Sequence, residues 1–183
     1  MGRNVEIKAR VDDLEALRER VEGLADSGPS TVVQKDTFFR SRRGRLKLRE
    51  MSDGVAELIY YARADTAEPI ESSYSKVPCS QPDALREALA SALGVRGQVR
   101  KKRLVYLCGP TRIHLDSVEG LGEFVELEVV LSAEGGIKDG ISVAHSLMAR
   151  LGIDPDDLVE ESYIDLKVAE AAKQTYPRYV PDL

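Results

Sequence analysis

The chain has 183 residues, of which 43% are hydrophobic and 31% charged, a composition that suits one packed domain and argues against a disordered chain. Its net charge is −5, whereas domains that coat nucleic acid are usually basic. Cys79 and Cys108 lack a zinc-binding spacing. No signal-peptide stretch or apolar run of roughly 18 residues is present. We therefore expect a cytoplasmic protein that uses neither a membrane nor nucleic acid as its partner.

The first predicted element is an N-terminal strand with alternating side-chain character. Glu6, Lys8 and Arg10 alternate with apolar residues over 5–11. Successive side chains of a strand point to opposite faces. One face of this strand would therefore be ionisable and the other apolar.

The rest of the chain reads as strands and helices separated by turn signals such as Asp53-Gly54. Apolar residues at helical spacing and capping residues predict four helices: from Asp12–Asp13 to the loop 27–30, from Gln81-Pro82 to Gly94, one that ends at Gly152, and one within 156–174. The other strands are predicted at 32–40, 44–51, 56–63, 70–77, 97–107, 111–117 and 123–131.

The charged and apolar alternation recurs on three later strands. It appears at 45–49, at 113–116 and at 125–129. Closing an antiparallel sheet removes its exposed edges, and the apolar strand faces need helices to cover them. The prediction is an α+β fold, an eight-stranded antiparallel closed barrel with a charged interior and helices outside. Residues 1–175 would form one domain and 176–183 an irregular tail.

A charged interior of this kind would contribute little to the stability of the fold. Two like charges about 4 Å apart repel by about 4 kcal/mol at an effective dielectric constant near 20, and buried ion pairs stabilise little once desolvation is counted. A wet lumen that receives a polyanion is the better explanation. Arg and Lys suit phosphate oxygens, and neighbouring carboxylates suit Mg²⁺ or Mn²⁺.

Several residues in a fixed order carry a family resemblance across about 3–167: Glu6-Ile7-Lys8, Gln34-Lys35-Asp36, Leu48-Arg49-Glu50-Met51, Arg63, Lys101-x-Arg103, the stretch from Asp116 to Glu128, and Ser162-Tyr163 with Leu166. This set resembles the CYTH family, also called triphosphate tunnel enzymes, and within it the class IV adenylyl cyclases. The resemblance implies a tunnel that binds a triphosphate with Mg²⁺ or Mn²⁺.

The resemblance also implies roles for particular residues. Phosphate would be held by Lys8, Arg49, Arg63, Lys101 and Arg103, with Lys47 as a weaker candidate on the same strand face as Arg49. Metal would be bound by Glu6, Asp116 and Glu126, with Glu128 as a helper. Glu6, Lys8, Arg49 and Glu126 would carry catalysis. One departure is Asn4, which stands where the family has its first Glu. His114 is left out of the site, because a lone histidine is more often structural.

The activity implied first is conversion of ATP to cyclic AMP and pyrophosphate. The alternative is a triphosphatase that hydrolyses thiamine triphosphate, a nucleoside triphosphate or inorganic tripolyphosphate. A further alternative is a nucleotide or polyphosphate sensor without catalysis. An RNA-binding module is disfavoured because aromatic residues are only 5% of the chain and the net charge is negative. The sequence leaves a homodimer open.

Overall fold

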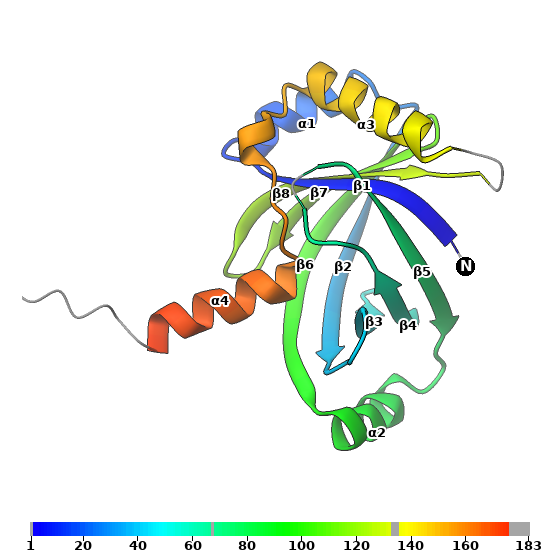
Figure 1. Cartoon of the computed structure of the whole chain (residues 1–183), viewed down its shortest axis with the longest axis vertical. Coiled ribbons are helices and arrows are strands. Elements are labelled where there is room, and N and C mark those ends of the chain that lie inside the picture. Colours follow the sequence, from blue (N-terminus) through cyan, green and yellow to red (C-terminus); the bar gives the residue numbers. More distant parts are fainter. Residues whose placement is uncertain (1, 67, 133–135, 176–183) are drawn as a thin grey trace, which may run out of the picture.

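The alternating strands close into an antiparallel barrel in the computed structural model, which describes residues 2–66, 68–132 and 136–175 (Figure 1). Around the barrel the order is β1-β5-β4-β3-β2-β6-β7-β8, and β1 closes it by pairing with both β5 and β8. The strands formed by the described residues are β1 (Gly2–Arg10), β2 (Ser27–Phe39), β3 (Arg45–Met51), β4 (Ala56–Ala62), β5 (Ile70–Pro78), β6 (Val95–Cys108), β7 (Thr111–Val118) and β8 (Gly122–Val130). The predicted fold class is confirmed.

Strand register brings the charged positions together on the inner face. On β1, Lys8 lies opposite Glu126 of β8. On the far wall, Asp36 of β2 lies opposite Arg49 of β3. Residues opposite one another in an antiparallel pair share a face of the sheet. Each of these paired strands therefore contributes charged side chains to the same lumen.

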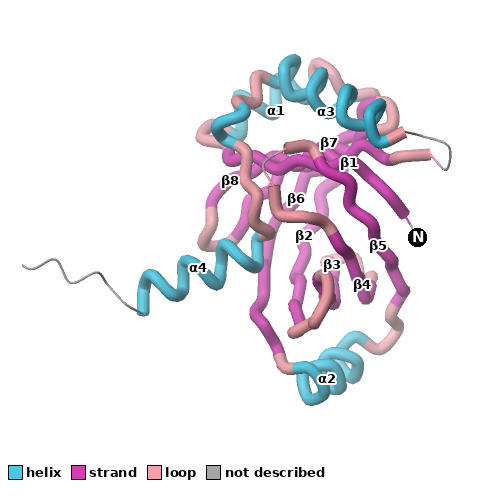
Figure 2. Tube along the Cα trace, viewed as in Figure 1, coloured by secondary structure: helices cyan, strands magenta, loops and turns pink. Residues whose placement is uncertain are grey.

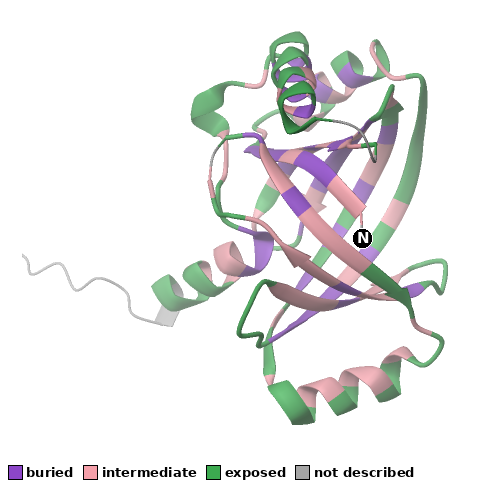
Figure 3. Cartoon of the chain, turned by 45° about the vertical axis from the view of Figure 1, so that its right-hand side comes forward, coloured by how far each residue is buried: buried purple, intermediate pink, exposed green. Residues whose placement is uncertain are grey.

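Two helices cover the outer face of β1, β7 and β8. They are α1 (Leu14–Glu22) and α3 (Ile137–Leu151), and Figure 1 shows both above these strands. Ile7 and Leu127 pack there with Leu17 and Leu151, and all four are buried. Buried positions in Figure 3 accordingly concentrate on the strands and on the barrel-facing sides of these helices. This layer is the main apolar core, so the outer face of the barrel is apolar here and its inner face is polar.

The remaining helices occupy other sides of the barrel. Helix α2 (Pro82–Leu93) joins β5 to β6 at the end opposite α1 and α3 (Figure 2), and none of its described residues is buried. Helix α4 (Tyr163–Thr175) starts against the barrel beside β6. It follows a short 3-10 helix, Pro155–Asp157. None of the helices in the described part of the chain is long and apolar enough to cross a membrane.

The structure corrects the predicted boundary between the first helix and the second strand. Helix α1 stops at Glu22, and the predicted loop 27–30 belongs to β2. Gly28 of β2 has φ +119°, a backbone conformation that glycine tolerates. It lies where the register between β2 and β6 shifts, between Ser27 and Ser30. A helix-breaking Gly-Pro pair therefore sits in a distorted strand.

The fourth helix begins at Tyr163, inside the predicted range 156–174, because the preceding segment runs along the barrel and pairs with it. The Val159 amide donates to the Lys8 carbonyl at 2.8 Å. The predicted tail 176–183 lies outside the described residues, and the predicted domain limits stay a prediction.

Helix α3 approaches β1 closely at Gly140. A Cβ atom there would lie 2.8 Å from Cγ2 of Val5 and 2.8 Å from Cδ2 of Leu131. We expect Gly140→Val to lower the free energy of unfolding by about 1–3 kcal/mol, because overpacking forces side chains or backbone to shift. Urea denaturation measures this change. Ser142→Val, at an exposed position of the same helix, is the control and should stay within about 0.5 kcal/mol of the wild type. Equal losses in the two variants would contradict close packing at Gly140.

Candidate functional site

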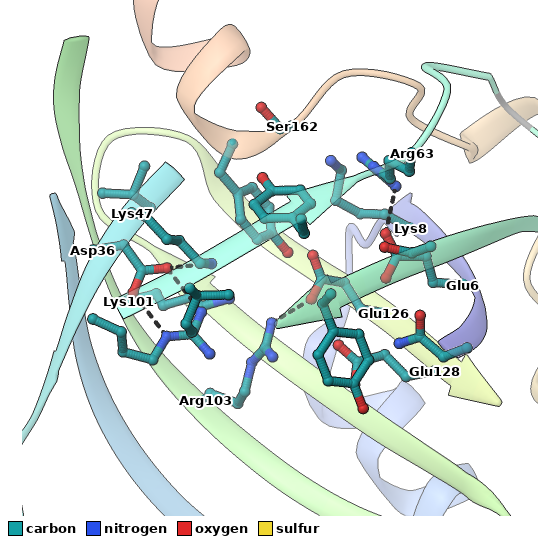
Figure 4. Close-up of a pocket in the computed structure, with 18 of the residues that line it drawn as sticks. Glu6, Lys8, Asp36, Lys47, Arg63, Lys101, Arg103, Glu126, Glu128 and Ser162 are labelled. Carbon is teal, nitrogen blue, oxygen red and sulfur yellow. Dashed lines mark hydrogen bonds and ion pairs between the residues drawn. The ribbon is translucent and has the colours of Figure 1, made fainter. Parts of the chain in front are cut away.

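The barrel encloses a cavity whose charged lining is mainly basic (Figure 4). Among the described residues that line it, eight are basic: Lys8, Lys47, Arg49, Arg63, Lys76, Lys101, Arg103 and Arg112. Four are acidic: Glu6, Asp36, Glu126 and Glu128. The chain as a whole carries a net charge of −5. Positive charge is therefore concentrated inside an acidic protein, which favours a small anionic ligand in the tunnel.

One side of the tunnel is organised around Asp36. Its carboxylate accepts from Lys47 Nζ at 2.8 Å and from Arg49 Nε and Nη2 at 2.8 Å each. Burial opposes ionisation of this carboxyl, but Arg49 and Lys47 outweigh that effect and hold the pKa of Asp36 well below its usual range. Burial and the neighbouring Arg49 lower the pKa of Lys47 to about 8. Asp36 thus aligns two predicted phosphate-binding cations.

A second charged cluster lies behind the cavity surface, around Asp116. This carboxylate is fully buried and accepts from Lys101 Nζ at 2.9 Å, Arg103 Nε at 2.6 Å and the Tyr163 hydroxyl at 2.9 Å. Burial alone would raise its pKa, but Arg103 and Lys101 lower the pKa of Asp116 to about 2. Asp116 is not among the described residues that line the cavity, and its predicted role as a metal ligand stays a prediction.

The opposite wall is acidic. Glu6 pairs with Arg63 at 3.2 Å, and Glu126 pairs with Arg103. Burial raises the pKa of Glu6 to about 7 despite the nearby Arg63. Glu128 accepts from Arg112 Nε at 2.9 Å. Each of these three carboxylates therefore has an arginine as an ion-pair partner.

His114 lies next to this wall, although it is not among the described residues that line the cavity. One ligand atom from each of His114, Glu126 and Glu128 can be chosen so that all lie within 4.8 Å of one another. His114 Nδ1 is buried and has no hydrogen-bond partner among the described residues. Burial and Arg103 lower the pKa of His114, so the imidazole is neutral at neutral pH. A neutral nitrogen beside two carboxylates is a chemically suitable donor set for a divalent ion.

The segment before α4 contacts the tunnel from one side. Ser162 and Tyr163 line the cavity, and Figure 4 shows Ser162 on the segment that leads into this helix. The Tyr163 ring lies 4.7 Å from Lys8 Nζ and 4.8 Å from Lys101 Nζ. Lys8 Nζ also donates to the Glu161 carbonyl. Tyr163 therefore both anchors the helix and reaches the tunnel.

The structure brings nearly all predicted site residues to one cavity: Glu6, Lys8, Lys47, Arg49, Arg63, Lys101, Arg103, Glu126 and Glu128 line it. Asn4 lines it as well and is 2% exposed. Sequence reasoning gave no role to Asp36, Lys76, Arg112 or His114. The signal for Arg112 and His114 was their alternation with Asp116, because residues 112, 114 and 116 of one strand share a face. Asp36 was part of the family resemblance, but its partners are distant in sequence.

Comparison with known proteins identifies the class to which this fold and site belong. The model of the CYTH domain matches residues 2–163, so the chain belongs to the CYTH family. It is 32% identical over 174 residues to adenylate cyclase CyaB of Aeromonas hydrophila, covering 87% of this chain and 85% of that protein.

Two solved structures show the same fold. The PH1012 protein of Pyrococcus horikoshii superposes with a TM-score of 0.80 at 24% identity, over 89% of this chain and 98% of that one. HpAC1 from Hippeastrum superposes with a TM-score of 0.65 at 15% identity, over 94% and 96% of the two chains. HpAC1 is described as having a dominant triphosphatase activity.

We expect Asp36→Asn to lower the free energy of unfolding by about 3 kcal/mol at neutral pH, because it leaves two buried cations without their shared carboxylate. Since the pKa of Asp36 is lowered in the folded protein, this stabilisation is present above about pH 4 and is lost in stronger acid. Urea denaturation at several pH values measures it.

The control for this substitution is Asp65→Asn. Asp65 pairs with Arg45 at 2.8 Å, but its side chain is 48% exposed. This loss should be below about 1 kcal/mol. An Asp36→Asn variant as stable as Asp65→Asn at neutral pH would contradict the structural role of Asp36.

Proposed function

We propose that this protein is a divalent-metal-dependent enzyme that acts on a triphosphate, most like a class IV adenylyl cyclase. The observation that carries the proposal is the excess of Lys and Arg over acidic residues around one cavity in an acidic protein, opposite a wall of carboxylates. A polyanion would neutralise the excess positive charge. A linear triphosphate carries charge opposite in sign to these cations and is small enough for an enclosed site.

The Lys and Arg side chains of the tunnel would bind the phosphates. Arg49 and Arg103 offer planar forks of N–H donors, of which the carboxylates occupy only part. Lys8, Lys47 and Lys101 add point charges that can follow the phosphate chain. These cations would hold the triphosphate extended and withdraw charge from the bonds that break.

The acidic wall fits a divalent ion. Glu6, Glu126 and Glu128, which line the cavity, are its candidate ligands. When bound, such an ion would neutralise phosphate charge and polarise the reacting phosphoryl group. Asn4 offers a neutral amide oxygen with no hydrogen-bond partner among the described residues. It adds no charge where the family has a Glu.

In the cyclase reaction, the tunnel would hold the ribose 3′-hydroxyl against the α-phosphorus. The hydroxyl oxygen forms the new bond, its proton passes to solvent, and pyrophosphate leaves toward the Lys and Arg side chains. Positioning and charge stabilisation would supply most of the acceleration. The adenylate cyclase name of the Aeromonas relative supports this version.

The second candidate is a triphosphatase, in which the same residues orient water against the terminal phosphorus. The triphosphatase activity described for HpAC1, which shares the fold, favours it. Thiamine triphosphate, nucleoside triphosphates and inorganic tripolyphosphate are the substrates to test. The third candidate is a sensor, which would bind the same ligands without turnover.

Product analysis tests the proposal. The protein is incubated with ATP, thiamine triphosphate or tripolyphosphate in Mg²⁺ or Mn²⁺, and products are identified by chromatography and phosphorus NMR. Cyclic AMP with pyrophosphate identifies the cyclase, and orthophosphate with a diphosphate identifies the hydrolase. Binding without turnover under every condition would overturn the enzyme proposal.

Arg49→Ala and Glu126→Gln should each lower the turnover rate by about 100-fold or more, because each removes a group aimed at the phosphates or the ion. Arg150→Ala and Glu87→Gln, at exposed positions of α3 and α2, are the matched controls and should keep wild-type rates. Circular dichroism checks that each variant is folded. Full activity in both site variants would refute the assignment of this cavity as the active site.

Lys47 should make ligand binding dependent on pH. Its pKa of about 8 means that it is about half neutral at pH 8, and a bound polyanion favours the charged form. Tripolyphosphate binding at pH 8 should therefore take up protons, and affinity should fall as pH rises from about 7 to 9. Calorimetry in buffers of different ionisation enthalpy measures the uptake.

In Lys47→Arg the uptake should shrink by about half a proton, because a guanidinium stays protonated throughout this range. Lys138→Arg, at an exposed position of α3, should leave the uptake unchanged. Identical uptake in the wild type and Lys47→Arg would show that Lys47 does not titrate against the ligand.

A further inference from the structure

His114 is a buried polar residue that the reaction described above does not require. It lies on β7, opposite Glu126 of β8 and Val105 of β6. Its exposed fraction is 4%. A buried histidine usually gives both ring nitrogens a partner, because an unsatisfied buried polar atom is costly. Nδ1 has no hydrogen-bond partner among the described residues, so it is free to bind something that the chain itself does not supply.

The surroundings of Nδ1 indicate what that partner is. Nδ1 lies 3.8 Å from Glu126 Oε2 and 3.8 Å from Glu128 Oε1. These separations are too long for hydrogen bonds. Donors about 2.1 Å from one shared ion lie about 3–3.5 Å apart, so small side-chain movements would bring all three atoms onto one cation.

The neighbouring arginines orient the two carboxylates. Arg112 Nε donates to Glu128 Oε2 at 2.9 Å, which leaves Oε1 as the oxygen nearer His114. Arg103 pairs with Oε2 of Glu126, the same oxygen that lies 3.8 Å from His114 Nδ1, so an ion bound there would share this oxygen with Arg103. Partners of this kind hold metal ligands in position. The imidazole and both carboxylates are therefore presented to a common point.

We propose that His114 is a direct ligand of the divalent ion in this tunnel, together with Glu126 and Glu128, and that its nitrogen makes the site prefer Mn²⁺ to Mg²⁺. The inference rests on the metal requirement of the proposed function and specifies the ligands and the ion. Mg²⁺ strongly favours oxygen ligands and gives up its waters reluctantly. First-row transition ions accept imidazole more readily. Replacing an oxygen donor by a nitrogen therefore penalises Mg²⁺ more than Mn²⁺.

Electron paramagnetic resonance of Mn²⁺ added to the substrate-free protein tests direct ligation. The chain contains two histidines, and the other, His145, is exposed on α3. The variant His145→Gln leaves His114 as the sole imidazole. Electron spin-echo modulation of bound Mn²⁺ should show a ¹⁴N coupling in this variant, which becomes a ¹⁵N coupling when histidine alone is labelled. Bound Mn²⁺ without a histidine nitrogen coupling would overturn the proposal, and this measurement needs no change at His114.

Metal affinities test the preference. Free Mn²⁺ is counted by its resonance signal, and Mg²⁺ affinity is obtained by competition with bound Mn²⁺. His114→Gln should raise the Kd for Mn²⁺ by about 10-fold or more while changing the Kd for Mg²⁺ much less, since glutamine offers an oxygen. His145→Gln should change neither. Equal losses of both ions in His114→Gln, or Mg²⁺ binding as tight as Mn²⁺ in the wild type, would contradict a selective role.

These outcomes are separable from failure of the proposed function. Turnover of a triphosphate with Mn²⁺ bound only through oxygen would refute the His114 inference and leave the enzyme proposal standing. Mn²⁺ bound through His114 without turnover would uphold the inference on metal ligation and overturn the enzyme. Absence of Mn²⁺ binding with and without tripolyphosphate would overturn both.

Discussion

Compensation of buried charge is the constraint on which this structure depends. Two carboxylates, Asp36 and Asp116, each accept from at least two cationic side chains inside the barrel. Without them, the Lys and Arg residues of the lumen would repel one another in a medium that screens charge poorly. The compensation remains incomplete among the described residues that line the cavity, where bases outnumber acids. That surplus would attract an anion to the free protein.

The barrel can hold this interior because its apolar core lies elsewhere. Residues such as Ile7 and Leu127 face outward and are covered by α1 and α3. Closure by β1, which pairs with both β5 and β8, gives hydrogen-bond partners to the backbone groups at the strand edges. Stability is therefore supplied by the outer layer, and the lumen is free to carry polar residues that a packed core would exclude.

The two faces of the lumen differ in chemical character. Around Asp36, paired cations present N–H donors whose geometry suits phosphate oxygens. Around Glu126 and Glu128, carboxylates and an unpartnered imidazole nitrogen suit a metal ion. Arg103 connects the faces, because it contacts both Asp116 and Glu126. Binding of an anion at one face and a cation at the other would therefore be electrostatically coupled.

The sequence by itself determined the barrel and most of its lining. Side chains alternate between the two faces of a strand with a period of two residues, so the sequence assigns each one to a face without knowledge of the opposite wall. Glu6, Lys8, Arg49 and Glu126 could be placed inside on that ground and given roles by family resemblance. Only the tertiary structure decided which charges meet. Asp36 with Lys47, Asp116 behind Lys101, and His114 beside Glu128 depend on strand register and side-chain direction. The same applies to Ser27–Ser30, where pairing with β6 keeps a Gly-Pro segment in a strand. Contacts between strands are set by how the whole sheet closes, and no local stretch of sequence carries that information.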